Sequence, residues 1–186
     1  MTQKFLEGTG VKVPHVYGDP ALLLPLIYNP HNIEKKYKMG IIPHYVDYKL
    51  PYVEEFRKEH PEILFIDLQN YKKWHDIIDQ ILSCEKIISS SLHGLILSDA
   101  YGIPNIRVNF SDKIVGGNFK YDDYNLAVRQ CTIEPIVFNG CIETERLDSN
   151  FQSYRPIKID VKKMLTTCPF TIKDRFMNPL CIKYNK

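Results

Sequence analysis

The sequence predicts an α/β protein built on a doubly wound, Rossmann-like parallel sheet. Two observations lead to this prediction. Four short apolar runs, typical of strands that are buried on both faces, recur before residue 111. Segments with the apolar spacing of amphipathic helices separate these runs, so strand and helix alternate along the chain. This alternation is typical of parallel strands joined by right-handed helical crossovers.

Each element has its own signal. The predicted strands cover residues 39–42, 63–68, 86–89 and 105–110, each a run of apolar residues. Helices are predicted at 52–60, 71–83 and 92–100. The second helix carries a stripe of Trp74 and isoleucines, which we expect in the core. Pro20 is placed to open a short helix, which Pro25 limits.

The most informative stretch is 86–110. Ser89, Ser90 and Ser91 lie at the end of the third strand and are the residue type best suited to cap the next helix. Gly102 then allows a left-handed helix end, and Pro104 prevents the helix from resuming. We therefore predict one strand, helix, strand unit here.

His93 lies in the first turn of that predicted helix, just beyond the end of a strand. Open α/β sheets bind ligands at this place, and the free amides of a helix N-terminus favour an anion. The stretch therefore predicts a phosphate or carboxylate site beside a titratable group. The alternative, equally open from spacing alone, is that the serines only cap the helix and that His93 is a satisfied side chain.

After residue 110 the pattern weakens. Residues 111–124 form a charged, glycine-containing segment that is long enough to close over a site. A helix at about 122–129, a short segment at 133–138, a polar stretch through 155 and a helix at 160–167 follow. We expect a leader, or the remnant of a missing domain, at 1–17, the α/β domain at 18–155, and a helical extension at 156–186.

Composition excludes several classes. A net charge of +2 provides no strong footprint for nucleic acid. The sequence contains neither an apolar run long enough for a membrane span nor a signal-peptide core, so we expect a cytoplasmic protein. The five cysteines and six histidines are scattered without metal-ligand spacing, so no metal site is predicted.

Several motifs occur together in a specific order. They are Gly18-Asp19-Pro20 before leucines, Gly-Ile-Ile-Pro-His-Tyr at 40–45, Ser-Leu-His-Gly at 91–94 with Ala-Tyr-Gly-Ile-Pro at 100–104, and Lys-x-Asp-Asp-Tyr at 120–124. In this order the chain resembles the polysaccharide pyruvyl transferases. The resemblance implies the C-terminal half of a glycosyltransferase-B-like fold, because members of that family are about twice this length. A missing N-terminal half is then a possible partner.

The resemblance also implies a chemistry. The donor would be phosphoenolpyruvate, the acceptor a sugar or lipid-linked glycan, and no metal or organic cofactor would be needed. Ketal formation requires a proton for the methylene carbon of the donor and positive groups for its phosphate and carboxylate. The predicted site comprises catalytic His93 and His44, the donor-binding residues Ser90, Ser91, Lys113, Lys120 and Arg107, and the substrate-binding residues Asp19, Asp123 and Tyr124.

Structural roles remain open for several of these residues. Lysines such as Lys113 and Lys120 are more often solvated charges. His44 is also compatible with a strand-end cap, Asp19 with an Asx turn, and Asp123 with a helix cap. Ser91 occupies a position where some relatives place arginine. Two other functions also remain open: a glycosyltransferase half-domain that uses a nucleotide sugar, and a non-catalytic carbohydrate-interaction domain.

Overall fold

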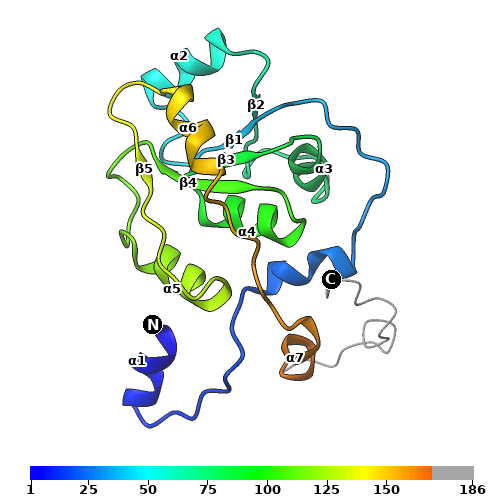
Figure 1. The fold of residues 1–186 in the computed structure, drawn as a ribbon, viewed down its shortest axis with the longest axis vertical. Coiled ribbons are helices and arrows are strands. Elements are labelled where there is room, and N and C mark those ends of the chain that lie inside the picture. The colour runs from blue at the N-terminus through cyan, green and yellow to red at the C-terminus, as the bar shows by residue number, and fades with distance from the viewer. Residues whose placement is uncertain (169–186) are drawn as a thin grey trace.

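A five-stranded parallel sheet forms the centre of the computed structural model, which describes residues 1–168 (Figure 1). The strands lie in the order β2-β1-β3-β4-β5, and every neighbouring pair is parallel. The predicted α/β class and parallel sheet are thus confirmed. In chain order the strands are β1 (Gly40–Ile42), β2 (Leu64–Phe65), β3 (Ile87–Ser89), β4 (Asn105–Asn109) and β5 (Ile136–Val137).

Helices cover both faces of the sheet, as a doubly wound fold requires (Figure 1). Helix α2 (Pro51–Glu59) and α6 (Thr144–Phe151) pack on the face that includes Ile41 and Ile88. Helix α3 (Asp76–Leu82) packs on the opposite face, against Ile42 and Ile87. Successive residues of a strand point to opposite faces, so the continuous apolar runs of β1 and β3 supply both cores.

Helices α4 (Leu92–Ala100) and α5 (Phe119–Val128) share a third apolar cluster with the 3-10 helix η1 (Pro20–Leu26). Pro20 opens η1 as predicted, whereas Pro25 is accommodated inside it. Gly102 ends the α4 segment with a φ of 68°, the predicted left-handed conformation. The remaining helices are α1 (Thr2–Gly8), in the segment expected to be a leader or the remnant of a missing domain, and α7 (Val161–Thr166), which falls within the predicted C-terminal helix. Residues 169–186 of the expected extension lie outside the described residues.

Four expectations need correction. Helix α3 begins at Asp76 rather than at residue 71, because the Asp76 carboxylate accepts the amide hydrogens of Lys72 and Lys73 at 3.2 and 2.8 Å and holds the preceding chain in a turn. Trp74 consequently lies outside the helix and is 49% exposed, so it is not part of the core. Helix α5 begins at Phe119, earlier than predicted, and α6 replaces part of the expected polar stretch.

The strand order reverses between β1 and β3, and we refer to this switch point with the loops beside it as the crevice. From β1 the chain moves outward to β2, then returns to β3 and continues to the other side of the sheet. The loops that follow β1 and β3 therefore leave in opposite directions, which is where open α/β sheets bind ligands. Within the described residues, no helix is long and apolar enough to cross a membrane.

Candidate functional site

Ser90 joins the two loops that border this crevice. Its hydroxyl oxygen accepts the amide hydrogen of His44 at 2.8 Å and donates to a carboxylate oxygen of Asp47 at 2.7 Å. Its own amide donates to the carbonyl of Ile42 at 3.2 Å. These three hydrogen bonds join the loop after β1 to the loop after β3, so His44 and the start of α4 lie at one edge of the sheet. The hydroxyl hydrogen of Ser90 is already donated to Asp47.

Asp47 is the hub of these loops. It is fully buried, and its second carboxylate oxygen accepts the hydroxyl hydrogen of Ser111, which follows β4. One side chain thus ties together the segments that leave β1, β3 and β4. Asp47 is not among the site residues predicted from the sequence. The available signal was a carboxylate three residues beyond His44, in a loop that leaves a buried strand.

The glycine of the Ser-Leu-His-Gly motif is required by packing. A Cβ atom at Gly94 would lie 2.4 Å from the Ser89 hydroxyl oxygen and 2.9 Å from a methyl carbon of Ile42. The first turn of α4 therefore rests directly on β1 and β3. Ser89 stabilises this turn by accepting the amide hydrogen of Ser91 at 3.0 Å. Ser91 occupies the N-cap position but makes no side-chain capping bond, so the predicted capping by this serine is wrong.

His93 projects from the same turn on its exposed side. It follows Ser90 by three residues, so it lies at the sheet edge that also carries the half-buried His44. Burial lowers the pKa of His44, the positive charge of Lys120 lowers it further, and Asp47 opposes the shift. The lowered pKa favours the neutral imidazole of His44, the form that can accept a proton.

Arg107 enters the site from β4. Its guanidinium carbon lies 3.8 Å from the centre of the Tyr121 ring, and one terminal nitrogen donates to the Asn118 side-chain oxygen at 2.6 Å. Tyr121 in turn donates its hydroxyl hydrogen to the Ser90 carbonyl at 2.6 Å. Burial lowers the pKa of Lys120, and the charge of Arg107 lowers it further. Arg107 and Lys120 thus bring two positive groups near Tyr121, which contacts the residue after β3.

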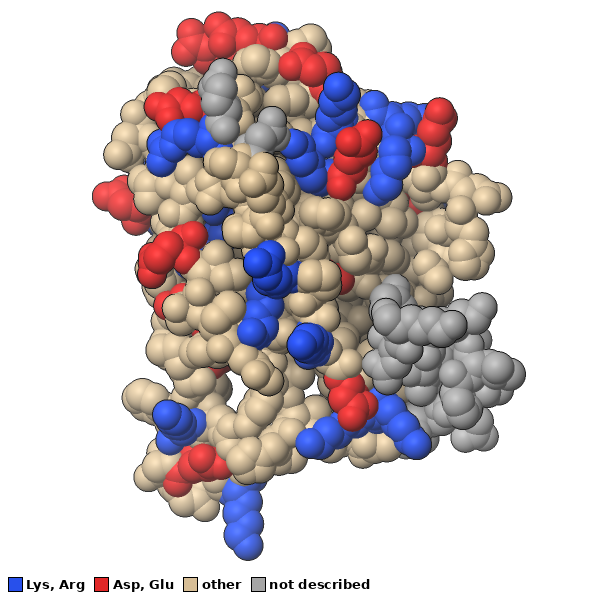
Figure 2. Space-filling view, in the orientation of Figure 1, with Lys and Arg blue, Asp and Glu red and all other residues tan. Residues whose placement is uncertain are grey.

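A cavity of about 570 Å³ lies beside this crevice, between α1, α4 and α5. Figure 2 shows the surface hollowed where α1 meets the rest of the molecule. Lys120 and Leu92 line the cavity. The three residues predicted to bind substrate line it too, namely Asp19, Asp123 and Tyr124.

The polar groups of these three residues already have protein partners. Asp19 accepts the amide hydrogen of Ala21 at 2.8 Å, the turn-holding role that the sequence left open. Asp123 accepts two hydrogen bonds from Thr2, at 2.9 and 2.6 Å. Tyr124 donates to Asp99 at 2.8 Å. The three residues predicted to bind substrate therefore hold the cavity walls in place through hydrogen bonds within the protein.

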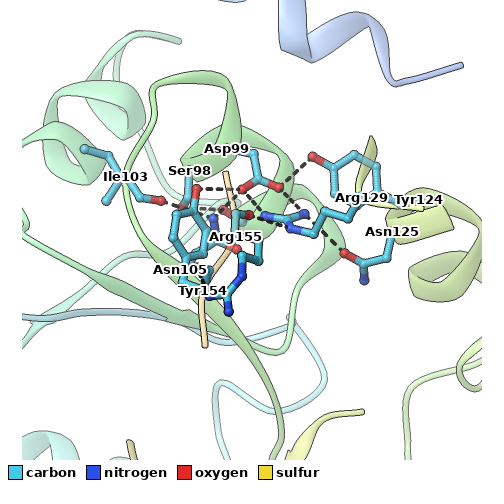
Figure 3. A network of polar contacts seen from close by, with 10 residues as sticks. Ser98, Asp99, Ile103, Asn105, Tyr124, Asn125, Arg129, Tyr154 and Arg155 are labelled. Atoms are coloured by element: carbon cyan, nitrogen blue, oxygen red, sulfur yellow. Dashed lines mark hydrogen bonds and ion pairs between the residues drawn. The ribbon is translucent and has the colours of Figure 1, made fainter. Parts of the chain in front are cut away.

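The contact of Tyr124 belongs to a buried network that fastens α5 to α4 (Figure 3). Asp99 and Arg129 form an ion pair at 2.5 Å, with side chains 0% and 5% exposed. Asn105 donates to Asp99 at 2.6 Å, and Tyr154 approaches it at 3.4 Å. Burial acts to lower the pKa of Arg129, but hydrogen bonding to Asp99 and its charge raise it overall. The network thus positions the helices that carry His93 and Lys120.

Lys113 behaves differently from the other predicted donor-binding residues. Its side chain is exposed, and its amide donates to the Ser111 hydroxyl oxygen at 3.2 Å. The structure therefore groups His44, Ser90, Lys120 and Arg107 closely, whereas Lys113 lies on the loop above them. Among residues 1–168, no three His, Cys, Asp or Glu side chains gather in a way that could hold a metal ion.

Comparisons with known proteins fit this arrangement. A family model described as polysaccharide pyruvyl transferase matches residues 1–112, which include β1 to β4 and the loops of the crevice. The uncharacterized protein L143 of Acanthamoeba polyphaga mimivirus is 40% identical over 113 residues, which make up 58% of this chain and 38% of that protein. The matched part of the chain therefore spans well under half of this relative. No solved structure matches the chain.

Proposed function

Because the chain belongs to the polysaccharide pyruvyl transferase family, we propose that it transfers pyruvate from phosphoenolpyruvate to two hydroxyl groups of a sugar in a glycan. The observation that supports this proposal most is the crevice at the strand-order reversal. A histidine on each side of it, with Lys120 and Arg107 between α5 and the sheet, provides proton-transfer groups beside positive charge.

The reaction makes three demands on such a site. The methylene carbon of the donor takes up one proton and becomes a methyl group, while two hydroxyl oxygens form bonds to the central carbon. The bond from that carbon to the phosphate oxygen breaks, and the second hydroxyl proton leaves with the released phosphate. The site must therefore deliver a proton, accept a proton and stabilise anionic oxygens.

We assign these tasks by exposure and charge. His93, at the exposed first turn of α4, is the proposed acid for the methylene carbon. His44, whose pKa burial lowers, is the proposed base for an attacking hydroxyl. Lys120 and Lys113 are the proposed clamps for the donor's charges, and the start of α4 with Ser91 is an additional anion-binding element. Ser90 has a positioning role, because its hydroxyl is committed to Asp47.

The proposed acceptor site is the cavity beside the crevice. Its volume of about 570 Å³ falls in the range of small-molecule sites, roughly 300 to 1,000 Å³, and Lys120 lines it while also acting on His44. A sugar placed between Asp19 and Asp123 would meet carboxylates, which accept hydrogen bonds from hydroxyl groups. We therefore propose that the donor occupies the crevice and the acceptor enters from the cavity.

Phosphate release tests the proposal. The chain, alone and together with any residues that flank it in its native reading frame, is incubated with phosphoenolpyruvate and candidate glycans. Release that depends on the glycan, with a ketal-bearing product in the mass spectrum, supports the transferase. Binding of a nucleotide sugar without binding of phosphoenolpyruvate would instead favour a glycosyltransferase domain, and glycan binding without turnover in either form would favour a carbohydrate-interaction domain.

A further inference from the structure

We infer that Arg107 and the N-terminal end of α5 form an anion-binding subsite for a phosphate or carboxylate group, and that Asn118 covers this subsite in the structure described here. The location follows from the structure alone. The identification of the ligand as phosphoenolpyruvate rests on the proposed function.

The first observation is an unsatisfied buried charge. Arg107 is 4% exposed, and its Nε and Nη1 atoms have no hydrogen-bond partner in the described part of the chain. These two atoms carry three of the five N–H groups of a guanidinium. Its Nη2 atom donates to an uncharged amide oxygen, that of Asn118. Buried polar groups are nearly always paired, so three free donors on one buried cation indicate a missing acceptor.

Stability does not explain this arrangement. Desolvation of a cation costs several kcal/mol unless an anion and hydrogen bonds compensate for it. The ring of Tyr121 lies against the guanidinium and offsets part of that cost. The carboxylates of Asp122 and Glu134 act on Arg107 only at a distance, since no ion pair within 4.0 Å joins it to an acidic side chain among residues 1–168. The charge remains available to an anionic ligand.

The surroundings favour an anion over a second cation. Asn118 is the residue that precedes α5, so the free amides and the positive end of this ten-residue helix lie beside the guanidinium. Lys120, in the first turn, adds an ammonium group that is close enough for the charge of Arg107 to lower its pKa. Two cationic side chains and a helix N-terminus that converge in this way match the oxygens of a phosphate or carboxylate.

The cover over the subsite is lightly held. The segment 111–118 contains Gly116 and Gly117, both with positive φ angles, and a Cβ atom on either would meet nothing within 4 Å. Val115 beside them is 88% exposed. The oxygen of Asn118 occupies one of the positions that a ligand oxygen would take on Nη2. A ligand therefore enters by displacing the Asn118 side chain, and the glycines allow the segment to move.

Calorimetric titration with inorganic phosphate and with phosphoenolpyruvate tests the subsite without any need for turnover. Arg107→Met keeps an unbranched side chain of similar length but removes the donors. We expect about a ten- to hundredfold loss of affinity for both ligands, which corresponds to one or two charge-assisted hydrogen bonds. The matched control is Arg57→Gln. Arg57 also lies over an aromatic ring, Tyr48, at 5.6 Å, but it is exposed, and its loss should leave binding unchanged.

A thermal melt provides the second measurement. Phosphate should raise the melting temperature of the wild-type chain and of Arg57→Gln, but not that of Arg107→Met, whose own melting temperature should equal or exceed that of wild type. Equal phosphate affinity in Arg107→Met and wild type, or no anion binding by wild type, overturns the inference. Phosphate binding that depends on Arg107, in a protein without pyruvyl transfer, leaves the subsite standing and refutes the proposed function instead.

Discussion

Replacing Asp99 with asparagine would test whether the buried network holds α5 against α4. The substitution keeps the size of the side chain but removes its negative charge. Arg129, 5% exposed, would then be a buried cation without its counter-ion, and Tyr124 would donate to a weaker acceptor. Breaking one partner of a buried ion pair typically costs about 3 to 5 kcal/mol.

The size of the effect can be carried through to an assay. In a chain of this length, 1 kcal/mol corresponds to about 2 to 4 °C in melting temperature. The loss from Asp99→Asn is therefore expected to be about 6 to 20 °C in thermal unfolding followed by circular dichroism. The matched control is Glu143→Gln, which removes an exposed i,i+3 pair with Arg146 and should change the melting temperature by no more than about 2 °C.

A double-mutant cycle identifies the source of the loss. If the unpaired cation causes it, Arg129→Met combined with Asp99→Asn should be less destabilised than the sum of the two single variants. A shift of less than about 2 °C for Asp99→Asn, or strictly additive effects in the cycle, would refute the conclusion that this ion pair fastens the two helices.

Three further changes probe the site itself. Gly94→Ala and Gly8→Ala both gain helix propensity, but a Cβ atom at Gly94 clashes with Ser89 at a cost of about 1 to 3 kcal/mol, whereas Gly8 has open space around it. The urea midpoint of Gly94→Ala should therefore lie below that of Gly8→Ala, and equal midpoints for the two variants would contradict the packing argument. In an NMR titration, His44 in the folded chain should gain its proton only below pH 6.5, so its contribution to stability is lost as the pH falls below 6.5 toward its folded pKa. Lys120→Gln should raise the pKa of His44, because it removes a positive charge that lowers it. An unchanged pKa in this variant would exclude the interaction between Lys120 and His44. Asn118→Ala should tighten phosphate binding severalfold by removing an internal competitor for Arg107, and weaker binding would contradict the covering role.

The sheet could be predicted because its strands carry their own signal. Runs such as Ile87–Ser89 are apolar on both faces and end in polar residues, and this pattern indicates buried parallel strands whatever surrounds them. The order of the strands could not be predicted from the sequence, because it depends on which helices pack on which face of the sheet. Helix α6 was missed because its segment is polar apart from Leu147 and Phe151, and the burial of Leu147 depends on contact with the core around Phe138.

The candidate site was predictable only in part, for a similar reason. His44, Ser90 and His93 each follow a strand, so their common sheet edge follows from the topology of parallel sheets. Asp47 was missed because its role arises from hydrogen bonds to serines 43 and 64 residues away in the chain. The sequence also could not predict that Arg107 is unpaired. The alternation of side chains along β4 can predict that a residue faces a helix, but not whether that helix offers a hydrogen-bond acceptor.

The central claim is that this crevice carries out pyruvyl transfer, with His93 supplying the proton. The most direct measurement is glycan-dependent phosphate release from phosphoenolpyruvate by the wild-type chain and by His93→Gln, in the form that contains any flanking native residues. Glutamine keeps much of the size and hydrogen-bonding capacity of histidine but cannot deliver the proton. The predicted result is a fall in turnover of about 10²- to 10⁴-fold with little change in melting temperature, since His93 is exposed. Turnover near the wild-type rate in His93→Gln would contradict the assignment.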